Sequence, residues 1–301
     1  MYALLLGGLC IGFAPVLVRL ADTGPVASAF WRLALAAPLL WLLSWRASRG
    51  SNPTSTTSRS AAPQRVSTLS ASAAWSPALL LAGVFFAADL GTWHFSIRDT
   101  TVANATLLAN CAPLLITLHA LLVHRRSPPR LYFLALALAL GGAFVLVSPN
   151  FSAGSQQLRG DALGLLAAVF YSGYMLAVKS ASARYATLRL MAVSTSVSAL
   201  LLCPVALWLS HHSGQPFWPG SSHGWWIVAA LAILTQVIGQ GLIASALGRL
   251  SVALSATGLL IQPAVSAVAA WLLFGESLRA VQIAGGLVLM VGIWLARRSQ
   301  T

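Results

Sequence analysis

The chain has 301 residues, of which 58% are hydrophobic and only 8% are charged. A soluble domain carries about 25% charged residues, so this composition excludes a soluble enzyme or binding domain and indicates a polytopic membrane protein. The net charge of +13 does not indicate a nucleic-acid-binding protein, because the basic residues separate apolar runs instead of forming one basic face.

The apolar runs predict an all-α integral membrane protein with ten transmembrane helices, because each run approaches the roughly 20 residues of helix that cross a bilayer. Their approximate bounds are residues 1–20, 25–45, 74–96, 101–123, 130–148, 160–179, 187–209, 224–247, 251–274 and 278–296. The first run has no basic segment before it, so we expect a retained helix and not a cleaved signal peptide. Residues 46–72 are rich in Ser, Thr, Pro and Arg and are expected to form a flexible cytoplasmic loop.

The distribution of basic residues predicts the orientation of the chain. Ten spans place both termini on one side of the membrane. If that side is the cytoplasm, most Lys and Arg residues fall in inner connections. The outer connections then hold only Arg19, Arg98, Arg159 and Arg279. By the positive-inside rule, both termini are therefore expected to be cytoplasmic, in an inner or plasma membrane.

The two halves of the chain show a weak internal repeat. A shift of 150 positions places Gly91 on Gly241, Pro113 on Pro263 and Gly142 on Gly292. Each half holds five spans, and because five is an odd number the second half enters the membrane upside down relative to the first. The predicted domains are residues 1–148 and 160–297. Inverted repeats are typical of transporters, with a binding site near the midplane between them.

Three segments resemble bacterial EamA-type carriers of the drug/metabolite transporter superfamily. They are SAFWRLALAAPLL (28–40), DLGTWHFSIRDTTVANATLLANCAPLL (89–115) and SVALSATGLLIQPAVSAVAAWLLFGESL (251–278). The resemblance covers nearly the whole chain and implies a ten-helix carrier with two EamA repeats that exports small metabolites, often amino acids or related compounds. The first half departs from the pattern, since His124-Arg125-Arg126 stands where a Gly-Glu pair is common and leaves Glu276 without a counterpart.

Asp89 is the only acidic residue placed deep inside a predicted span. A carboxylate there costs about 2.5–3.5 kcal/mol on insertion scales and usually faces a protein interior or a watery cavity. A helix turns by about 100° per residue, so Trp93 shares the face of Asp89, whereas His94 lies about 140° away and no Asp-His dyad is expected. Two interpretations stay open: Asp89 is a proton-coupling or substrate-amine site, or it is a structural partner, for example of Arg32. Arg32 is expected to snorkel toward the membrane surface or to form this ion pair.

Further polar side chains predict the rest of a central cavity. Thr106, Asn110, Pro113 and Thr117 share one face of the fourth span, and such a stripe either lines a path or joins helices by hydrogen bonds. Pro113 and Pro263 are expected to kink their helices near mid-span. The residues predicted to line the cavity are Asp89, Trp93, His94, Asn104 and Asn110 from the first half, and Tyr171, Tyr174, Gln236, Gln240 and Gln262 from the second.

No cofactor or metal site is expected. His211, His212 and His223 lie in a turn-rich connection without acidic or Cys ligands, and Cys10, Cys111 and Cys203 are embedded in apolar sequence without ligand spacing. The sequence contains no P-loop or Rossmann fingerprint.

The predicted function is secondary active transport by alternating access. The protein is expected to export small metabolites that are zwitterionic or cationic, with Asp89 as the candidate carrier of a coupling proton. Its partners are a small-molecule substrate and the lipid bilayer, and either a monomer or a homodimer is compatible with the sequence. A membrane-embedded enzyme acting on a lipid-type substrate is the alternative, but it would need paired acids, and Asp99, Asp161 and Glu276 lie at different span ends. A non-transporting membrane sensor also stays open.

Overall fold

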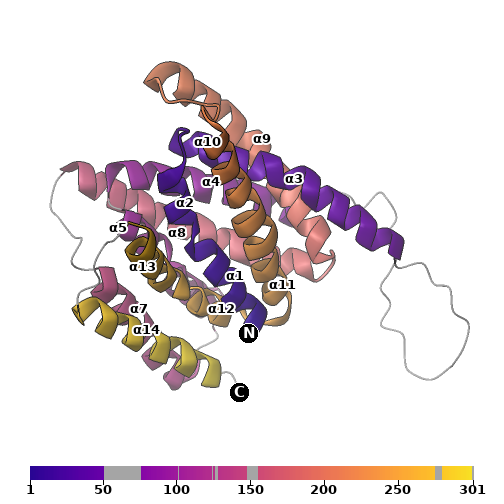
Figure 1. Ribbon diagram of the computed structural model, residues 1–301. Helices are drawn as coiled ribbons and strands as arrows, with labels where there is room; N and C mark the ends of the chain where they lie inside the picture. Colours follow the sequence, from indigo (N-terminus) through magenta and orange to yellow (C-terminus); the bar gives the residue numbers. More distant parts are fainter. Residues whose placement is uncertain are drawn as a thin grey trace, which may run out of the picture.

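The computed structural model of the protein describes residues 1–50, 76–100, 102–123, 125, 128–147, 155–274 and 280–299, and every regular element within them is helical (Figure 1). The first half contains α1 (Tyr2–Gly12), α2 (Ala14–Leu20), α3 (Pro25–Gly50), α4 (Pro77–Asp99), α5 (Val102–Ala109), α6 (Ala112–Leu122) and α7 (Arg130–Val147). The second half contains α8 (Ser155–Ser182), α9 (Thr187–Ser213), α10 (Ser222–Ala230), the π-helix η3 (Leu231–Gln240), α11 (Gly241–Arg249), α12 (Val252–Gly258), α13 (Ile261–Phe274) and α14 (Ala280–Arg298).

In the described part of the chain, nine helical segments are long and apolar enough to cross a bilayer, and α7 is a tenth, shorter apolar helix. Four of the nine segments combine several elements: α1 with α2, α5 with α6, α10 with η3 and α11, and α12 with α13. The ten-helix, all-α prediction is confirmed. Helices suit this composition because a membrane core offers no water, so each backbone N–H and C=O must find its partner within the segment.

Two spans are interrupted at related positions. The fourth span breaks between α5 and α6 at Asn110 and Cys111, just before Pro113, and the ninth breaks between α12 and α13 at Leu259 and Leu260, just before Pro263. At each break an amide donates to a carbonyl three residues earlier, from Cys111 to Leu108 and from Leu260 to Thr257. Proline has no N–H to donate, so it begins a new helix more easily than it continues an old one.

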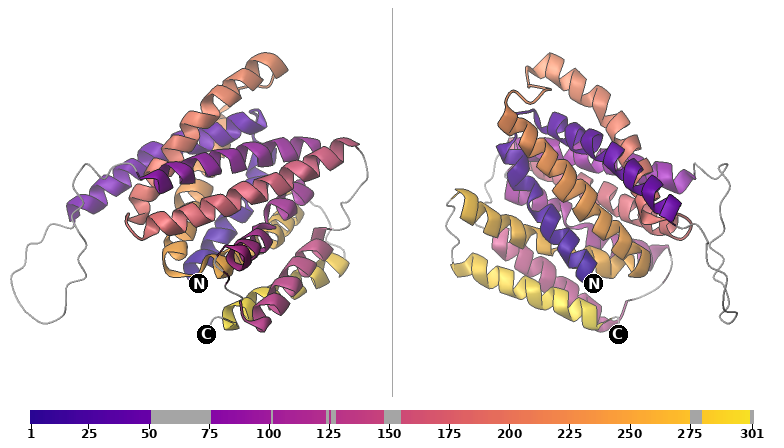
Figure 2. Two further views of the ribbon diagram at one scale, coloured as in Figure 1. Left: turned by 180° about the vertical axis from the view of Figure 1, so that it is seen from behind. Right: turned by 45° about the vertical axis from the view of Figure 1, so that its right-hand side comes forward.

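α7 and α14 pack side by side along one edge of the bundle (Figures 1 and 2). Gly142 of α7 touches the backbone of Gly285 and Leu289, and Gly292 of α14 touches the backbone of Ala139. A Cβ atom at either glycine would overlap that backbone, so only glycine permits this close approach. Small residues at helix contacts are typical of membrane proteins, where backbone proximity and van der Waals packing replace the hydrophobic effect.

Both termini lie at the same end of the bundle, which we call the termini end (Figures 1 and 2). Met1 packs there against Ala135 and Ala296. The Tyr132 hydroxyl lies 3.3 Å from the Thr117 hydroxyl and 3.1 Å from the Thr257 hydroxyl, so polar groups of α6, α7 and α12 meet at this end. These contacts join the two halves of the chain.

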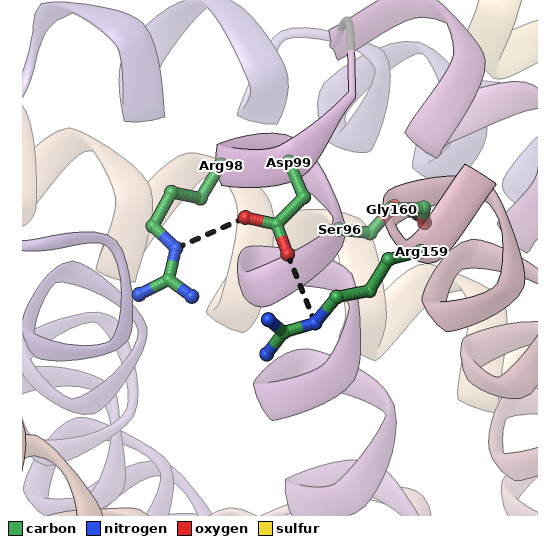
Figure 3. Close-up of polar contacts among 5 residues, drawn as sticks. All are labelled: Ser96, Arg98, Asp99, Arg159 and Gly160. Carbon is green, nitrogen blue, oxygen red and sulfur yellow. Dashed lines mark hydrogen bonds and ion pairs between the residues drawn. The ribbon is translucent and has the colours of Figure 1, made fainter. Parts of the chain in front are cut away.

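The opposite end, which we call the distal end, holds a cluster of charged residues between α4 and α8 (Figure 3). Asp99 is paired with Arg98 at 3.2 Å and with Arg159 at 3.4 Å, each distance measured from Nε to a carboxylate oxygen. The Ser96 hydroxyl donates to the Gly160 carbonyl at 2.7 Å. A Cβ atom at Gly160 would lie only 2.6 Å from the Thr100 nitrogen, so the two helices nearly touch here.

Candidate functional site

A cavity of about 70 Å³ lies between the helices of both halves. It is smaller than the roughly 300–1,000 Å³ that is usual for small-molecule sites. α1, α2, α3, α4, α5, α8, η3 and α13 contribute to its wall. Its lining residues are Ile11, Ala14, Pro15, Arg32, Phe86, Asp89, Leu90, Trp93, Thr106, Ala109, Asn110, Tyr171, Gln240, Gln262 and Ser266.

Asp89 lies near the middle of α4 and borders the cavity with only 8% of its surface exposed. Trp93 follows it one helical turn later on the same wall, and Phe86 precedes it. Among the residues that the structure describes, none donates a hydrogen bond to the Asp89 carboxylate or forms an ion pair with it. A carboxylate is therefore available to a cation or a proton inside the cavity.

Arg32 borders the same cavity and is 3% exposed, so it does not reach the membrane surface as a snorkelling arginine would. Its Nε donates to the Gln236 side-chain oxygen at 3.1 Å, and the Gln236 nitrogen donates in turn to the Thr195 hydroxyl at 3.0 Å. Within the described residues Arg32 and Asp89 form no ion pair at contact distance, but the two charges lie close enough to interact electrostatically.

The neutral polar side chains of the cavity wall come from both halves of the chain. The buried Gln240 side chain lies close enough to the Tyr171 and Tyr174 hydroxyls to interact with both, although its amide nitrogen has no partner of ideal hydrogen-bond geometry among the described residues. Asn110 uses its nitrogen on the Thr106 carbonyl at 2.8 Å, which leaves its amide oxygen available. Gln262, 8% exposed, borders the cavity just before Pro263. Amide side chains such as those of Asn110 and Gln262 can offer both donors and acceptors to a ligand.

Six of the ten predicted lining residues border the cavity: Asp89, Trp93, Asn110, Tyr171, Gln240 and Gln262. Gln236 does not, because its side chain is completely buried between Arg32 and Thr195 and hydrogen-bonds to both. Tyr174 does not, because its ring stacks on Phe86 at 4.7 Å and is completely buried.

His94 and Asn104 are the two remaining residues of the predicted lining. His94 is 1% exposed and does not border the cavity, since it points to another side of α4, as the helical rotation indicated. Its Nδ1 donates to the Leu90 carbonyl at 2.7 Å, because a carbonyl only accepts. The backbone of Asn104 lies in α5, but its side chain is outside the described residues, as are His124 and Glu276.

The polar stripe of the fourth span divides at the break in the helix. Thr106 and Asn110, before the break, border the cavity, whereas Thr117 contacts Tyr132 near the termini end. Both readings of the stripe therefore apply, each to a different part of it.

The sequence prediction of the cavity missed Pro15 and Ser266. Pro15 lies in the first turn of α2, just after the interruption between α1 and α2, and borders the cavity. The proline itself indicated that interruption. Ser266 lies one turn after Gln262 on α13, where helical spacing would have found it.

The family model of the EamA-like transporter family matches residues 1–148 and 158–298 of the chain. Two curated relatives, both named pseudopaline exporter CntI, come from Pseudomonas aeruginosa strains UCBPP-PA14 and PAO1. Each is 30% identical over 216 residues, which covers 71% of this chain and 72% of the relative. A solved structure titled only "Crystal structure of protein" matches the fold with a TM-score of 0.74 at 17% identity, over 98% of this chain and 96% of that one. The chain therefore belongs to the EamA-like transporter family and is a membrane transporter.

Proposed function

We propose that this transporter exports a small zwitterionic or cationic metabolite through the cavity between its two halves. The observation that carries the proposal is the Asp89 carboxylate, which borders a mid-bundle cavity and pairs with no described residue. An unpaired carboxylate is costly inside a membrane unless a ligand or a proton compensates it. The naming of two relatives as exporters supports the direction of transport.

Asp89 also carries the coupling proton in this proposal. Its carboxylate holds the amine of the substrate when deprotonated and releases it when protonated, so entry of a proton drives exit of the metabolite. In this proposal the termini end faces the cytoplasm. The basic residues Arg130, at the start of α7, and Lys179, which donates to the Leu250 carbonyl at 2.9 Å, agree with this orientation by the positive-inside rule.

Alternating access follows from treating residues 1–148 and 160–297 as inverted repeats that rock around the cavity. The interruptions before Pro113 and Pro263 support this, as do the related glycines Gly142 and Gly292, each of which packs on the backbone of the other helix where α7 meets α14. The contacts of Tyr132 at the termini end would open in one of the alternate states.

The first test compares metabolites in the medium and the cytosol of cells that express equal membrane levels of the wild type, Asp89→Asn or Asp99→Asn. Asp99 is the matched control, because it is also a carboxylate of α4 but lies outside the cavity lining. We expect one metabolite to accumulate in the medium with the wild type and the control, but not with Asp89→Asn. Full export with retained pH dependence in Asp89→Asn would refute the coupling role.

A second test distinguishes a transporter from a sealed sensor. Single cysteines replace Asn110 or Gln240 in a background without Cys10, Cys111 and Cys203. A water-borne thiol reagent should modify both positions, and a substrate should protect them. Resistance of both cysteines to the reagent would favour the sensor.

A further inference from the structure

We infer that Arg32 binds the carboxylate of the substrate while Asp89 binds its amine, so that the cavity selects amino-carboxylates over simple amines. This inference rests on the proposed function and adds a second anchor to it. It concerns the one cationic side chain in the cavity lining.

The geometry of Arg32 suits a carboxylate. Its Nε–H is used by Gln236, and within the described residues this is the only hydrogen bond of the guanidinium. The remaining N–H groups of the fork therefore lack a hydrogen-bond partner among the described residues, and the guanidinium carbon lies 5.9 Å from the centre of the Phe86 ring, although only 3% of the side chain is exposed. A planar guanidinium donates two parallel hydrogen bonds to a carboxylate, which neither an amine nor a neutral amide can accept.

The support behind Arg32 fixes it in place. Gln236 of η3 bridges Arg32 of α3 to Thr195 of α9, and both hydrogen bonds are buried. A guanidinium held by a side chain on a neighbouring helix loses less conformational freedom when it binds a ligand. Gln236 is therefore a positioning residue for Arg32.

The two charged side chains of the cavity favour a ligand that carries both a positive and a negative charge. Arg32 and Asp89 border one cavity and interact electrostatically, yet no hydrogen bond or contact ion pair joins them within the described residues. Each is costly when left unpaired in a membrane interior. A zwitterion satisfies both groups at once, whereas an amine without a carboxylate satisfies Asp89 alone. Phe86 and Trp93 add apolar and aromatic walls beside the charged groups.

The test uses full-length protein in lipid nanodiscs and measures binding as ligand-dependent thermal stabilisation. The probes are the twenty proteinogenic amino acids, each compared with its carboxamide and its N-acetyl derivative. The carboxamide removes the negative charge of the probe, and the N-acetyl form removes the positive charge. The proteins are the wild type, Arg32→Gln, Arg32→Lys, Asp89→Asn and, as a matched control, Arg159→Gln, whose arginine side chain is 69% exposed at the distal end.

We expect the wild type to bind at least one free amino acid at least about tenfold more tightly than its carboxamide, because charged hydrogen bonds are about twice as strong as neutral ones. Arg32→Gln should abolish this preference, because it weakens binding of the free amino acid while the carboxamide still binds. Arg32→Lys should restore the preference in part. Asp89→Asn should abolish the preference for the free amine over the N-acetyl form. Arg159→Gln should change neither preference.

Three outcomes would overturn the inference: no stabilisation of the wild type by any free amino acid, equal binding of acid and carboxamide to the wild type, or equal weakening of acid and carboxamide by Arg32→Gln. Continued binding of the carboxamide shows that a variant is folded, and Arg32→Lys provides a second reading if Arg32→Gln does not fold. The export assay tests the proposed function separately from the role of Arg32. If export depends on Asp89 but not on Arg32, the proposed function holds and the role of Arg32 is wrong.

Discussion

Opposite charges occur in two places along α4, and the two places differ in how the protein uses them. At the distal end, Asp99 is paired with Arg98 and Arg159 at 3.2 and 3.4 Å (Figure 3). In the middle, Asp89 and Arg32 border one cavity without pairing. Satisfied charges join two helices, whereas unsatisfied charges beside a cavity form a site.

The difference arises from what holds the arginine. Arg98 is the chain neighbour of Asp99, and Arg159 is directly followed by Gly160, where α8 touches the end of α4. Arg32 is instead hydrogen-bonded to Gln236, which belongs to another helix. A side chain fixed by a third group is not free to neutralise its nearest opposite charge, so its charge remains available to a ligand.

The largest effect is expected from Asp89→Asn. It removes the unpaired carboxylate and should lower export at least about tenfold, because a hydrogen bond to a charged group contributes about 1.5–3 kcal/mol. The remaining export should no longer depend on external pH. Thermal unfolding in detergent should stay the same or shift upward, since an isolated charge in the membrane interior is unfavourable. A large loss of thermal stability would instead assign Asp89 a structural role.

Gln236→Leu should allow Arg32 and Asp89 to form an ion pair, as Asp99 does with its arginines at the distal end. Without the amide, Arg32 is free to move onto Asp89, and export should fall by about fivefold, the effect of roughly one hydrogen bond. A double-mutant cycle of Arg32→Gln and Asp89→Asn should then show a larger coupling energy in thermal stability than in the wild-type background, where the two charges interact without contact. Thr195→Val removes only the second hydrogen bond of Gln236 and leaves its oxygen for Arg32, so it should have a smaller effect than Gln236→Leu. Coupling of equal size in both backgrounds would contradict this account.

Asp99→Asn should act on stability and hardly on transport. Both ion pairs of the carboxylate are lost, but Arg98 and Arg159 are partly exposed at 38% and 69% and remain hydrated. The free energy of unfolding should fall by about 1 kcal/mol, and export should stay within about twofold of the wild type. Melting in detergent and the efflux assay measure the two quantities. A loss of export as large as that of Asp89→Asn would remove the distinction between the two places.

The smallest effect is expected from Arg159→Gln. An exposed ion pair contributes about 0.2–1 kcal/mol, and Asp99 keeps Arg98 as its partner. The change in stability should disappear in high salt, because salt screens exposed charges more than buried ones. A loss that persists in high salt would indicate a packing role for the stem of Arg159.

Much of the cavity wall on α4 and α5 was predictable from helical rotation alone. Asp89 and Trp93 share a face, His94 points elsewhere, and Thr106 with Asn110 follows the same spacing on the next helix. The break in the fourth span was signalled by Pro113. These are relations within one helix, so the order of residues determines them.

The sequence by itself determined the membrane class, the ten helices and the faces of single helices, because hydropathy and the helical period are local properties. Only the tertiary structure decided that Arg32 borders the cavity without pairing, that Gln236 supports it, and that Tyr174 is packed away on Phe86. Each of these depends on which helix lies opposite which. In an apolar bundle that choice is made by close packing between residues distant in the chain, such as Gly142 and Leu289, and hydropathy carries no information about it.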